Sequence, residues 1–263
     1  MNFSRIVSVA LALMTVTLSN SSAGEGVALS SPVAVLELFT SQGCSSCPSA
    51  DKLLTALGSD RTLRGKIVPL AFHVDYWNRL GWSDPFSSAD WSRRQNSYAQ
   101  AFRASQVYTP QIVVNGATEA VGSDSAAIRR QIDAALRVPP PAQVRLTVTK
   151  PANASGKVDV ALDARAGSAI KSGRLNLMVA LFENGVITDV VKGENSGRKL
   201  RNDFVVRKLT NVLSIAPGSS SKGSTSFNVD KAWMLDNLGV AAFLQDPKTL
   251  RIYAASAVQV TAK

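Results

Sequence analysis

The sequence predicts an α/β domain followed by an all-β antiparallel sandwich, and two patterns carry this prediction. In the first half, short apolar runs of strand length alternate with segments of helical periodicity. In the second half, roughly seven to eight short alternating segments are separated by turn residues over about 120 residues, as is typical of a sandwich. Three consecutive prolines at 139–141 lie between the halves. Because consecutive prolines end a helix and stiffen a connector, we place the domain boundary there.

The first half has the predicted order β-α-β-α-β-β-α. Its predicted elements are strands at 33–39 and 66–74, helices at 45–58 and 87–104, a hairpin at 111–121 and a closing helix at 123–136. Leu53, Leu54 and Leu57 recur at helical spacing in the first helix, and Asn115-Gly116 is the strongest short signal for a hairpin turn. Apolar strands that alternate with helices favour parallel pairing with both sheet faces covered.

The second half carries most of the net charge of +10. Residues 139–263 hold 17 Lys and Arg against 9 Asp and Glu, whereas residues 24–138 hold 11 against 10, and we take these ranges as the two domains. The strands predicted in the second half are 143–149, 157–164, 175–183, 203–209, 224–229, 240–246 and 251–260. A basic run between them contains Lys192, Arg198, Lys199, Arg201, Arg207 and Lys208. This run is either a patch for an acidic partner or a solvated face.

The N-terminal segment predicts a secretory signal peptide. Arg5 lies in a short polar stretch, an uncharged apolar run extends from Ile6 to Leu18, and Ser21 and Ala23 supply the small residues that precede a cleavage site. As a helix, the apolar run rises only about 20 Å, too little for a hydrocarbon core of roughly 30 Å. We therefore expect residues 1–23 to be removed, no membrane span, and a periplasmic or secreted protein.

Both cysteines of the chain, Cys44 and Cys47, follow the first predicted strand and lie at the start of the first predicted helix. The free N–H groups and the dipole of a helix start stabilise a thiolate, and Cys-x-x-Cys pairs have lowered thiol pKa values. This placement predicts that Cys44 attacks a disulfide and that Cys47 resolves the mixed disulfide. The alternative is an inert structural disulfide, although so short a loop gains little stability.

Thr109-Pro110 stands directly before the third predicted strand. The motifs that accompany it are ELFTSQGCSSCPSAD, FHVDYWNRLGW, RRQNSYA and VYTPQIVVNG. With these motifs the chain resembles thioredoxin-fold proteins and, more narrowly, the secreted family known as domain of unknown function 1223 (DUF1223). The resemblance implies a thioredoxin-like fold with a helical insertion at 75–105, and a cis Thr109-Pro110 bond lying against the cysteine pair. It also implies a redox role without an established substrate. Ser45-Ser46 between the cysteines departs from the Gly-Pro of ordinary thioredoxins.

Four further residues are candidates for tuning the cysteine site. His73 is the only histidine in the chain and shares a strand face with Asp75. It either stabilises the thiolate, completes a Cu(I) site with both cysteines, or is a buried histidine bonded to Asp75 or a backbone carbonyl. Trp77 either covers the site or packs within the insertion. Glu37, in an otherwise apolar strand, is a candidate proton relay to Cys47.

The function that we expect from the sequence is thiol–disulfide exchange with the thiols or disulfides of other exported proteins. The redox-active disulfide replaces any dissociable cofactor, and a second, unidentified redox partner must recharge it. A copper-binding or copper-delivery protein and a non-enzymatic binding module are the alternatives. The chain has no phosphate-binding loop, no dinucleotide glycine fingerprint and no recognised nucleic-acid motif, so nucleotide and nucleic-acid partners are not expected.

Overall fold

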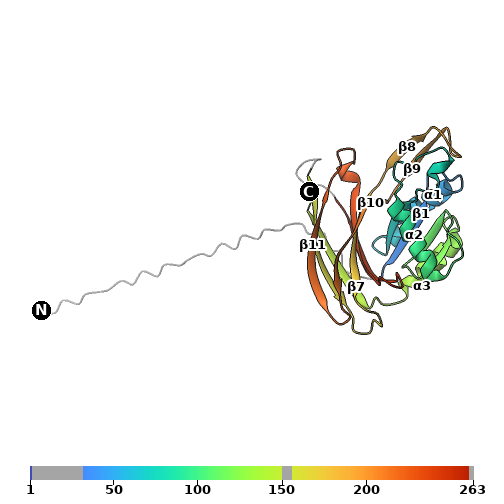
Figure 1. Cartoon of the computed structure of the whole chain (residues 1–263). Helices are drawn as coiled ribbons and strands as arrows, with labels where there is room; N and C mark the ends of the chain where they lie inside the picture. Colours follow the sequence, from blue (N-terminus) through green and yellow to red (C-terminus); the bar gives the residue numbers. More distant parts are fainter. Residues whose placement is uncertain (2–31, 150–155, 261–263) are drawn as a thin grey trace.

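The computed structural model describes Met1 and residues 32–149 and 156–260 (Figure 1). The predicted signal peptide therefore lies, apart from Met1, outside the described residues. The helices are α1 (Cys47–Ser59), α2 (Ala89–Phe102) and α3 (Ser125–Leu136). The strands of the first half are β1 (Ala34–Thr40), β2 (Ile67–His73), β3 (Gln111–Val114) and β4 (Thr118–Val121). Those of the second half are β5 (Ala142–Thr149), β6 (Lys157–Ala166), β7 (Leu175–Glu183), β8 (Val186–Val190), β9 (Arg198–Asn202), β10 (Val205–Ile215), β11 (Ser220–Asn228), β12 (Leu238–Gln245) and β13 (Ile252–Gln259).

Strands from both halves form one sheet of eight strands, in the order β13-β12-β7-β10-β2-β1-β3-β4. The halves join where β10 runs parallel to β2, with Val205 paired to Ala71. The N–H of Ala71 donates to the carbonyl of Phe204 at 2.8 Å. The sheet is mixed, because β1 is parallel to β2 but antiparallel to β3.

The predicted fold class is therefore wrong. The molecule is mostly β-sheet, and its large mixed sheet is not a thioredoxin-like α/β domain followed by a separate sandwich. Most of the predicted strands and helices are present within a few residues of their expected positions. Periodicity along a chain shows where an element forms, but it does not show which strand edge that element will pair with.

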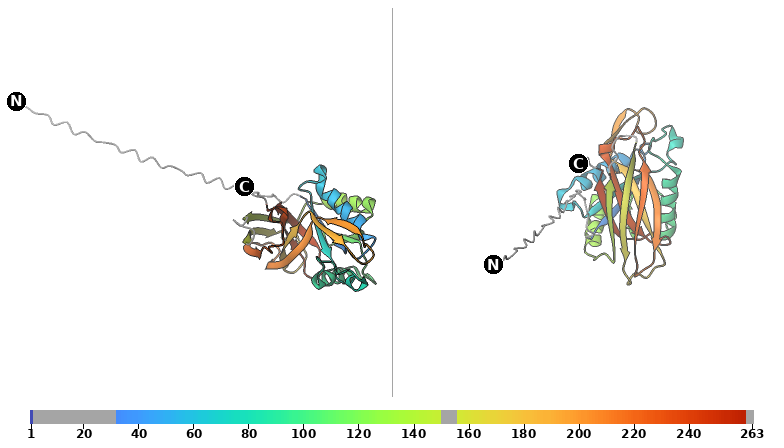
Figure 2. Two further views of the ribbon diagram at one scale, coloured as in Figure 1. Left: turned by 90° about the horizontal axis from the view of Figure 1, so that it is seen from above. Right: turned by 90° about the vertical axis from the view of Figure 1, so that its left-hand side faces the viewer.

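The alternation of side chains in β1 positions the helices. Leu36 and Leu38 face α1 and α3, whereas Val35 and Phe39 face α2, because successive strand residues point to opposite faces. The two helix layers lie on opposite sides of the sheet (Figure 2, left). All seven residues of β1 and of β2 are buried, as expected of strands covered on both faces.

The second half forms two further layers. β11, β6 and β5 make a three-stranded antiparallel sheet that packs against β7, β12 and β13 of the large sheet through a shared apolar core (Figure 2, right). β8 and β9 form a separate hairpin that lies beside α1 (Figure 1). In the described part of the chain, no helix has both the length and the apolar character needed to cross a membrane.

Phe204 lies at the junction between the halves and packs its ring against the end of α1. Its backbone lies in the left-handed region with φ of 59°, and a Cβ on Gly58 at the end of α1 would lie 2.2 Å from the Phe204 ring.

We expect Gly58→Ala to lower the free energy of unfolding by about 1–3 kcal/mol, because the Phe204 ring has to shift. The loss should be smaller when Phe204 is also changed to Leu, measured by urea denaturation of the double-mutant cycle. Gly173→Ala is the control because a Cβ there meets nothing within 4 Å; equal losses at both glycines would contradict this account.

Candidate functional site

The cysteine pair lies in the turn between β1 and α1. Cys44 is 1% exposed and Cys47 is fully buried, while Ser45 and Ser46 between them are exposed. The helix begins at Cys47, with Ser46 as its N-cap residue. The expectation that Cys44 opens the helix is therefore wrong by three residues, since the residues between β1 and Cys47 form turns.

The sulfur of Cys44 lies against a side chain and a neighbouring loop. In the described part of the chain, its hydrogen-bond partners are the Ser46 hydroxyl at 3.3 Å and the Thr109 carbonyl at 3.9 Å. The Thr109-Pro110 bond is cis, as the family resemblance implied. The indole N–H of Trp77 donates to the Thr109 hydroxyl at 2.7 Å, so Trp77 fixes the loop that faces Cys44.

The loop between β8 and β9 clamps the cysteine turn from the second half of the chain. The side-chain amide of Asn195, which is 1% exposed, donates to the carbonyls of Gln42 and Cys44 at 2.9 and 2.8 Å. Glu194 accepts the N–H of Ser45 at 2.8 Å, and this backbone hydrogen bond lowers the pKa of the Glu194 carboxyl. Neither residue was predicted from the sequence, because some 150 positions separate each of them from the turn that they hold.

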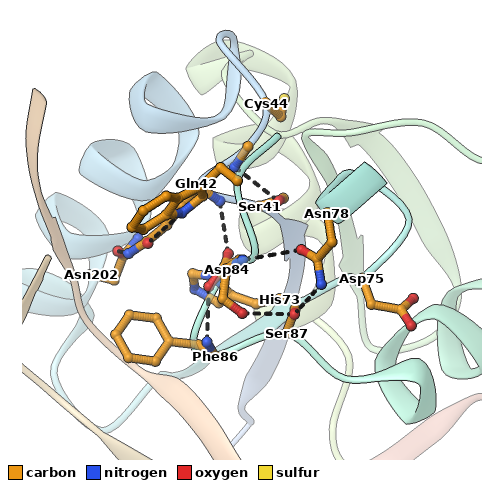
Figure 3. A network of polar contacts seen from close by, with 12 residues as sticks. Ser41, Gln42, Cys44, His73, Asp75, Asn78, Asp84, Phe86, Ser87 and Asn202 are labelled. Carbon is orange, nitrogen blue, oxygen red and sulfur yellow. Dashed lines mark hydrogen bonds and ion pairs between the residues drawn. The ribbon is translucent and has the colours of Figure 1, made fainter. Parts of the chain in front are cut away.

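A buried carboxylate, Asp84, connects the turn to His73 (Figure 3). One oxygen of Asp84 accepts the N–H of Gln42 at 2.8 Å and lies 2.7 Å from His73 Nδ1, and the other accepts the N–H of Phe86 at 2.9 Å. Burial by itself lowers the pKa of His73, but the Asp84 carboxylate outweighs it and the net pKa is raised. Burial raises the pKa of Asp84, but His73 and the N–H donors hold it below its ordinary value. The two groups therefore form a buried ion pair.

Asp75 and Glu37 do not join this network. Asp75 accepts the hydroxyl of Ser92 at 2.5 Å, and its side chain points away from His73 (Figure 3). Glu37 is fully buried and pairs with Arg94, with the hydroxyl of Tyr98 at 2.5 Å from it. Because Arg94 and Tyr98 belong to α2, Glu37 lies on the sheet face opposite to α1 and does not approach Cys47.

Asp51 is a buried acid that sequence analysis overlooked. It follows Cys47 by one helical turn on the same face of α1 and is 6% exposed. Burial raises its pKa to about 6, while the charge of His73 and the nearby Thr40 hydroxyl limit the rise. Its position was readable, because it precedes the buried Leu54 by three residues on the apolar face of the helix.

Three buried polar atoms surround Asp51 without a hydrogen-bond partner in the described residues. They are Thr40 Oγ1, His73 Nε2 and Asn202 Nδ2. Thr40 and Asn202 lie near enough to Asp51 to lower its pKa, but neither makes a hydrogen bond of good geometry to it. Thr40 is paired with His73 in the register of β1 and β2. The interior below the cysteines is therefore polar, and not all of its hydrogen-bonding groups are paired with one another.

The predicted copper ligands are not gathered as a metal site. Within residues 32–149 and 156–260, no group of three His, Cys, Asp or Glu side chains is arranged to hold a metal ion. His73 Nδ1 is already engaged by Asp84. Cys44 and Cys47 lie at the same end of β1 as the His73–Asp84 pair and the buried acid Asp51, which are groups that can hold or exchange protons.

A protein family and solved structures of other proteins match most of the chain. The family described as protein of unknown function (DUF1223) matches residues 35–245. The crystal structure of protein AGR_C_4864 from Agrobacterium tumefaciens is 29% identical, with a TM-score of 0.67, and the match covers 88% of this chain and 95% of that one. HBP35 of Porphyromonas gingivalis is 18% identical with a TM-score of 0.65 over 87% of this chain and 75% of its own, a likeness of fold alone. No curated protein matches the chain.

The position of Glu194 predicts the reactivity of Cys44. A carboxylate hydrogen-bonded to the residue after Cys44 disfavours a neighbouring thiolate. We expect Glu194→Gln to move the alkylation of Cys44 to lower pH, because the thiolate then loses a neighbouring negative charge. The measurement is the pH dependence of alkylation by iodoacetamide, made in a Cys47→Ser background so that one thiol reacts. Asp133→Asn on α3 is the control, and an equal shift in both variants would contradict the prediction.

The raised pKa of Asp51 predicts a pH-dependent stability. A carboxyl whose folded pKa lies above its unfolded value of 3.8 destabilises the native state as pH rises from about 4 to about 6. Asp51→Asn should therefore gain stability relative to the unsubstituted protein across this range, by up to about 3 kcal/mol, with no further change above pH of about 6. Urea denaturation at a series of pH values measures the difference. A difference that stays constant from pH 4 to 8 would contradict the assignment.

Proposed function

The chain belongs to the DUF1223 family, and we propose that it is a thiol–disulfide oxidoreductase that acts on other exported proteins through Cys44 and Cys47. One observation carries the proposal. Two cysteines separated by two residues lie at the end of β1, buried together, with the Thr109 carbonyl 3.9 Å from the sulfur of the first. Loops that carry Trp77, Thr109 and Asn195 converge on this turn.

The reaction proceeds through a mixed disulfide. The Cys44 thiolate attacks one sulfur of a substrate disulfide, the substrate S–S bond breaks, and the released substrate thiolate takes up a proton. The Cys47 thiolate then attacks the Cys44 sulfur, which releases the second substrate thiol and leaves a Cys44–Cys47 disulfide. Two electrons have passed to the substrate, and a dithiol protein must return them. In the opposite direction the same steps oxidise a substrate dithiol, and a disulfide-bearing protein closes the cycle.

Asp51 is suited to accept the proton of the Cys47 thiol. Cys47 must lose its proton before it attacks, and it is fully buried, so water does not reach it directly. Asp51 lies one helical turn away and, with a pKa of about 6, is mostly ionised at neutral pH and able to accept a proton. His73 acts on Asp51 through its charge and so has a positioning role in this scheme.

The burial of Cys44 sets a condition on access. Because Cys44 is 1% exposed, a substrate disulfide reaches its sulfur only when the side chains over it move. The groups in contact with the sulfur belong to Ser46 in the turn and to Thr109 in a loop, and neither belongs to a strand of the sheet. We therefore propose that the substrate displaces the Thr109 contact when it docks.

The proposed location is the periplasm or the exterior of the cell. The support is the signal-peptide pattern of residues 1–23, which lies in the sequence rather than in the described residues. Disulfides persist in that compartment, so substrates of the proposed reaction are present there. The protein's own cysteine pair carries the electrons, and no dissociable cofactor enters the scheme.

Trapping tests the proposal. We expect the full-length Cys47→Ser protein, expressed in its native compartment, to accumulate reducible mixed disulfides on Cys44, because the resolving sulfur is missing. Gel electrophoresis with and without reductant detects them, and mass spectrometry identifies the partners. The Cys44→Ser, Cys47→Ser double variant is the matched control and should show none.

The same experiment separates the alternatives. Absence of adducts on Cys44, together with failure of the purified protein to reduce or form any disulfide, would sink the redox proposal. A copper protein would instead bind Cu(I) in stoichiometric amount, and the His73→Ala variant would no longer bind it. A non-enzymatic binding module would keep its biological role in Cys44→Ser.

A further inference from the structure

The structure divides the basic run of the second half between two places. Arg207 pairs with the buried Glu183 at 2.7 Å and lies over the rings of Phe86 and Trp233, so it belongs to the interior side of β10. The basic residues Arg198, Lys199 and Arg201 instead belong to β9, in the hairpin beside α1. The run is therefore not one continuous patch, and the β9 portion has its own surroundings.

The β9 residues line a groove against α1, which we call the α1–β9 groove. Its walls are the α1 side, from Ser45 to Thr55, and the β9 side, from Arg198 to Asn202, and its volume is about 630 Å³. A volume of this size lies within the range of about 300–1,000 Å³ that is usual for binding sites. Asp203 at the end of β9 accepts the hydroxyl of Thr55 at 2.9 Å, so the two walls are joined at one end.

The charges of the groove are unbalanced. Lys52, Arg198, Lys199 and Arg201 are cationic and exposed, and the one carboxylate among the lining residues, Asp51, is buried. Lys199 and Arg201 have acidic neighbours, Asp189 at 3.4 Å and Asp203 at 3.3 Å. The Lys199–Asp189 pair is exposed on both sides and holds little free energy, so an anionic occupant can compete for Lys199. Arg201 is itself exposed, but its partner Asp203 has a side chain that is only 6% exposed.

The groove begins at the cysteine turn. Ser45, which lines it, is the residue next to Cys44, and Ser49 and Lys52 continue the wall along α1. A polypeptide whose cysteine forms the mixed disulfide with Cys44 therefore has its neighbouring residues within reach of the groove. The cations of the groove attract acidic side chains in that segment and raise the rate of encounter.

We propose that the α1–β9 groove binds an acidic segment that flanks the reacting cysteine of the protein substrate. This inference rests on the proposed exchange reaction for its purpose, but the binding itself does not require the reaction. It assigns a substrate class: proteins that carry Asp or Glu beside the cysteine to be exchanged. The basic hairpin is then a specificity element rather than a solvated face.

The experiment compares three disulfide-linked peptides that differ in the residues beside the cysteine: acidic, neutral amide and basic. At low salt the unsubstituted protein should exchange with the acidic peptide about tenfold or more faster than with the neutral one, and the advantage should shrink as salt is raised. A triple variant, Lys52→Gln, Lys199→Gln and Arg201→Gln, should lose this advantage and keep its rate with the neutral peptide. Arg198 is left in place because its guanidinium donates to the Asn195 side chain at 2.8 Å.

The matched control removes three charges elsewhere. Arg145→Gln, Arg165→Gln and Lys222→Gln change exposed residues of the three-stranded sheet, which lies at the other end of the molecule from α1 (Figure 1). This control has the same net charge as the groove variant, so it should keep the preference for the acidic peptide. Equal rates for acidic and neutral peptides in the unsubstituted protein would overturn the groove proposal and leave the exchange reaction standing.

A second measurement keeps the two proposals distinguishable. Fluorescence anisotropy follows binding of a labelled acidic peptide in which Ser replaces the cysteine, so no exchange occurs. Binding that weakens at least severalfold in the groove variant but not in the control supports the groove, even if no disulfide is exchanged. Equal binding by the two triple variants overturns the groove, whatever the exchange assay shows.

Discussion

The site depends on one buried ion pair, that between His73 and Asp84. Both side chains have no exposed surface, and an unpaired charge in that position would cost several kcal/mol. Each group therefore keeps the other ionised, and the raised pKa of His73 and lowered pKa of Asp84 express the same interaction. Asp84 also accepts the N–H groups of Gln42 and Phe86. Through Gln42, the ion pair at the end of β2 fixes the turn that carries the cysteines at the end of β1.

This constraint explains why the site needs both halves of the chain. The turn is held from inside by Asp84 and from outside by Asn195, which occupies the carbonyls of Gln42 and Cys44. Asn195 reaches the turn because β10, which follows the β8–β9 hairpin, pairs with β2 in the middle of the large sheet. Separate domains connected only by the proline run would leave this clamp without a fixed position. The continuous sheet is thus the scaffold of the site as well as of the fold.

The sequence was informative where signals are local and uninformative where contacts are distant. The positions of β1, α1 and the hairpin around Asn115-Gly116 follow from periodicity and turn chemistry, and the cysteine pair is visible by its spacing. Strand alternation predicts that Asp75 lies on the same face as His73 and can bond to it. The chain turns after β2, however, and the residue that contacts the imidazole is Asp84. Neither the clamp of Asn195 nor the pairing of β10 has a local signal, whereas Asp51 has one in its helical spacing from Cys47.

The charge beside Cys44 links the reactivity of the thiol to the hairpin. The expected source of thiolate stabilisation was the helix start, but α1 begins only at Cys47 and the N–H of Ser45 is given to Glu194. The field at the sulfur is therefore a balance between the helix dipole and a carboxylate that belongs to the β8–β9 loop. That same hairpin supplies the β9 wall of the α1–β9 groove. If an occupant of the groove displaces the hairpin, the Glu194 carboxylate moves relative to the sulfur at the same time, and docking would then alter the reactivity of the thiol.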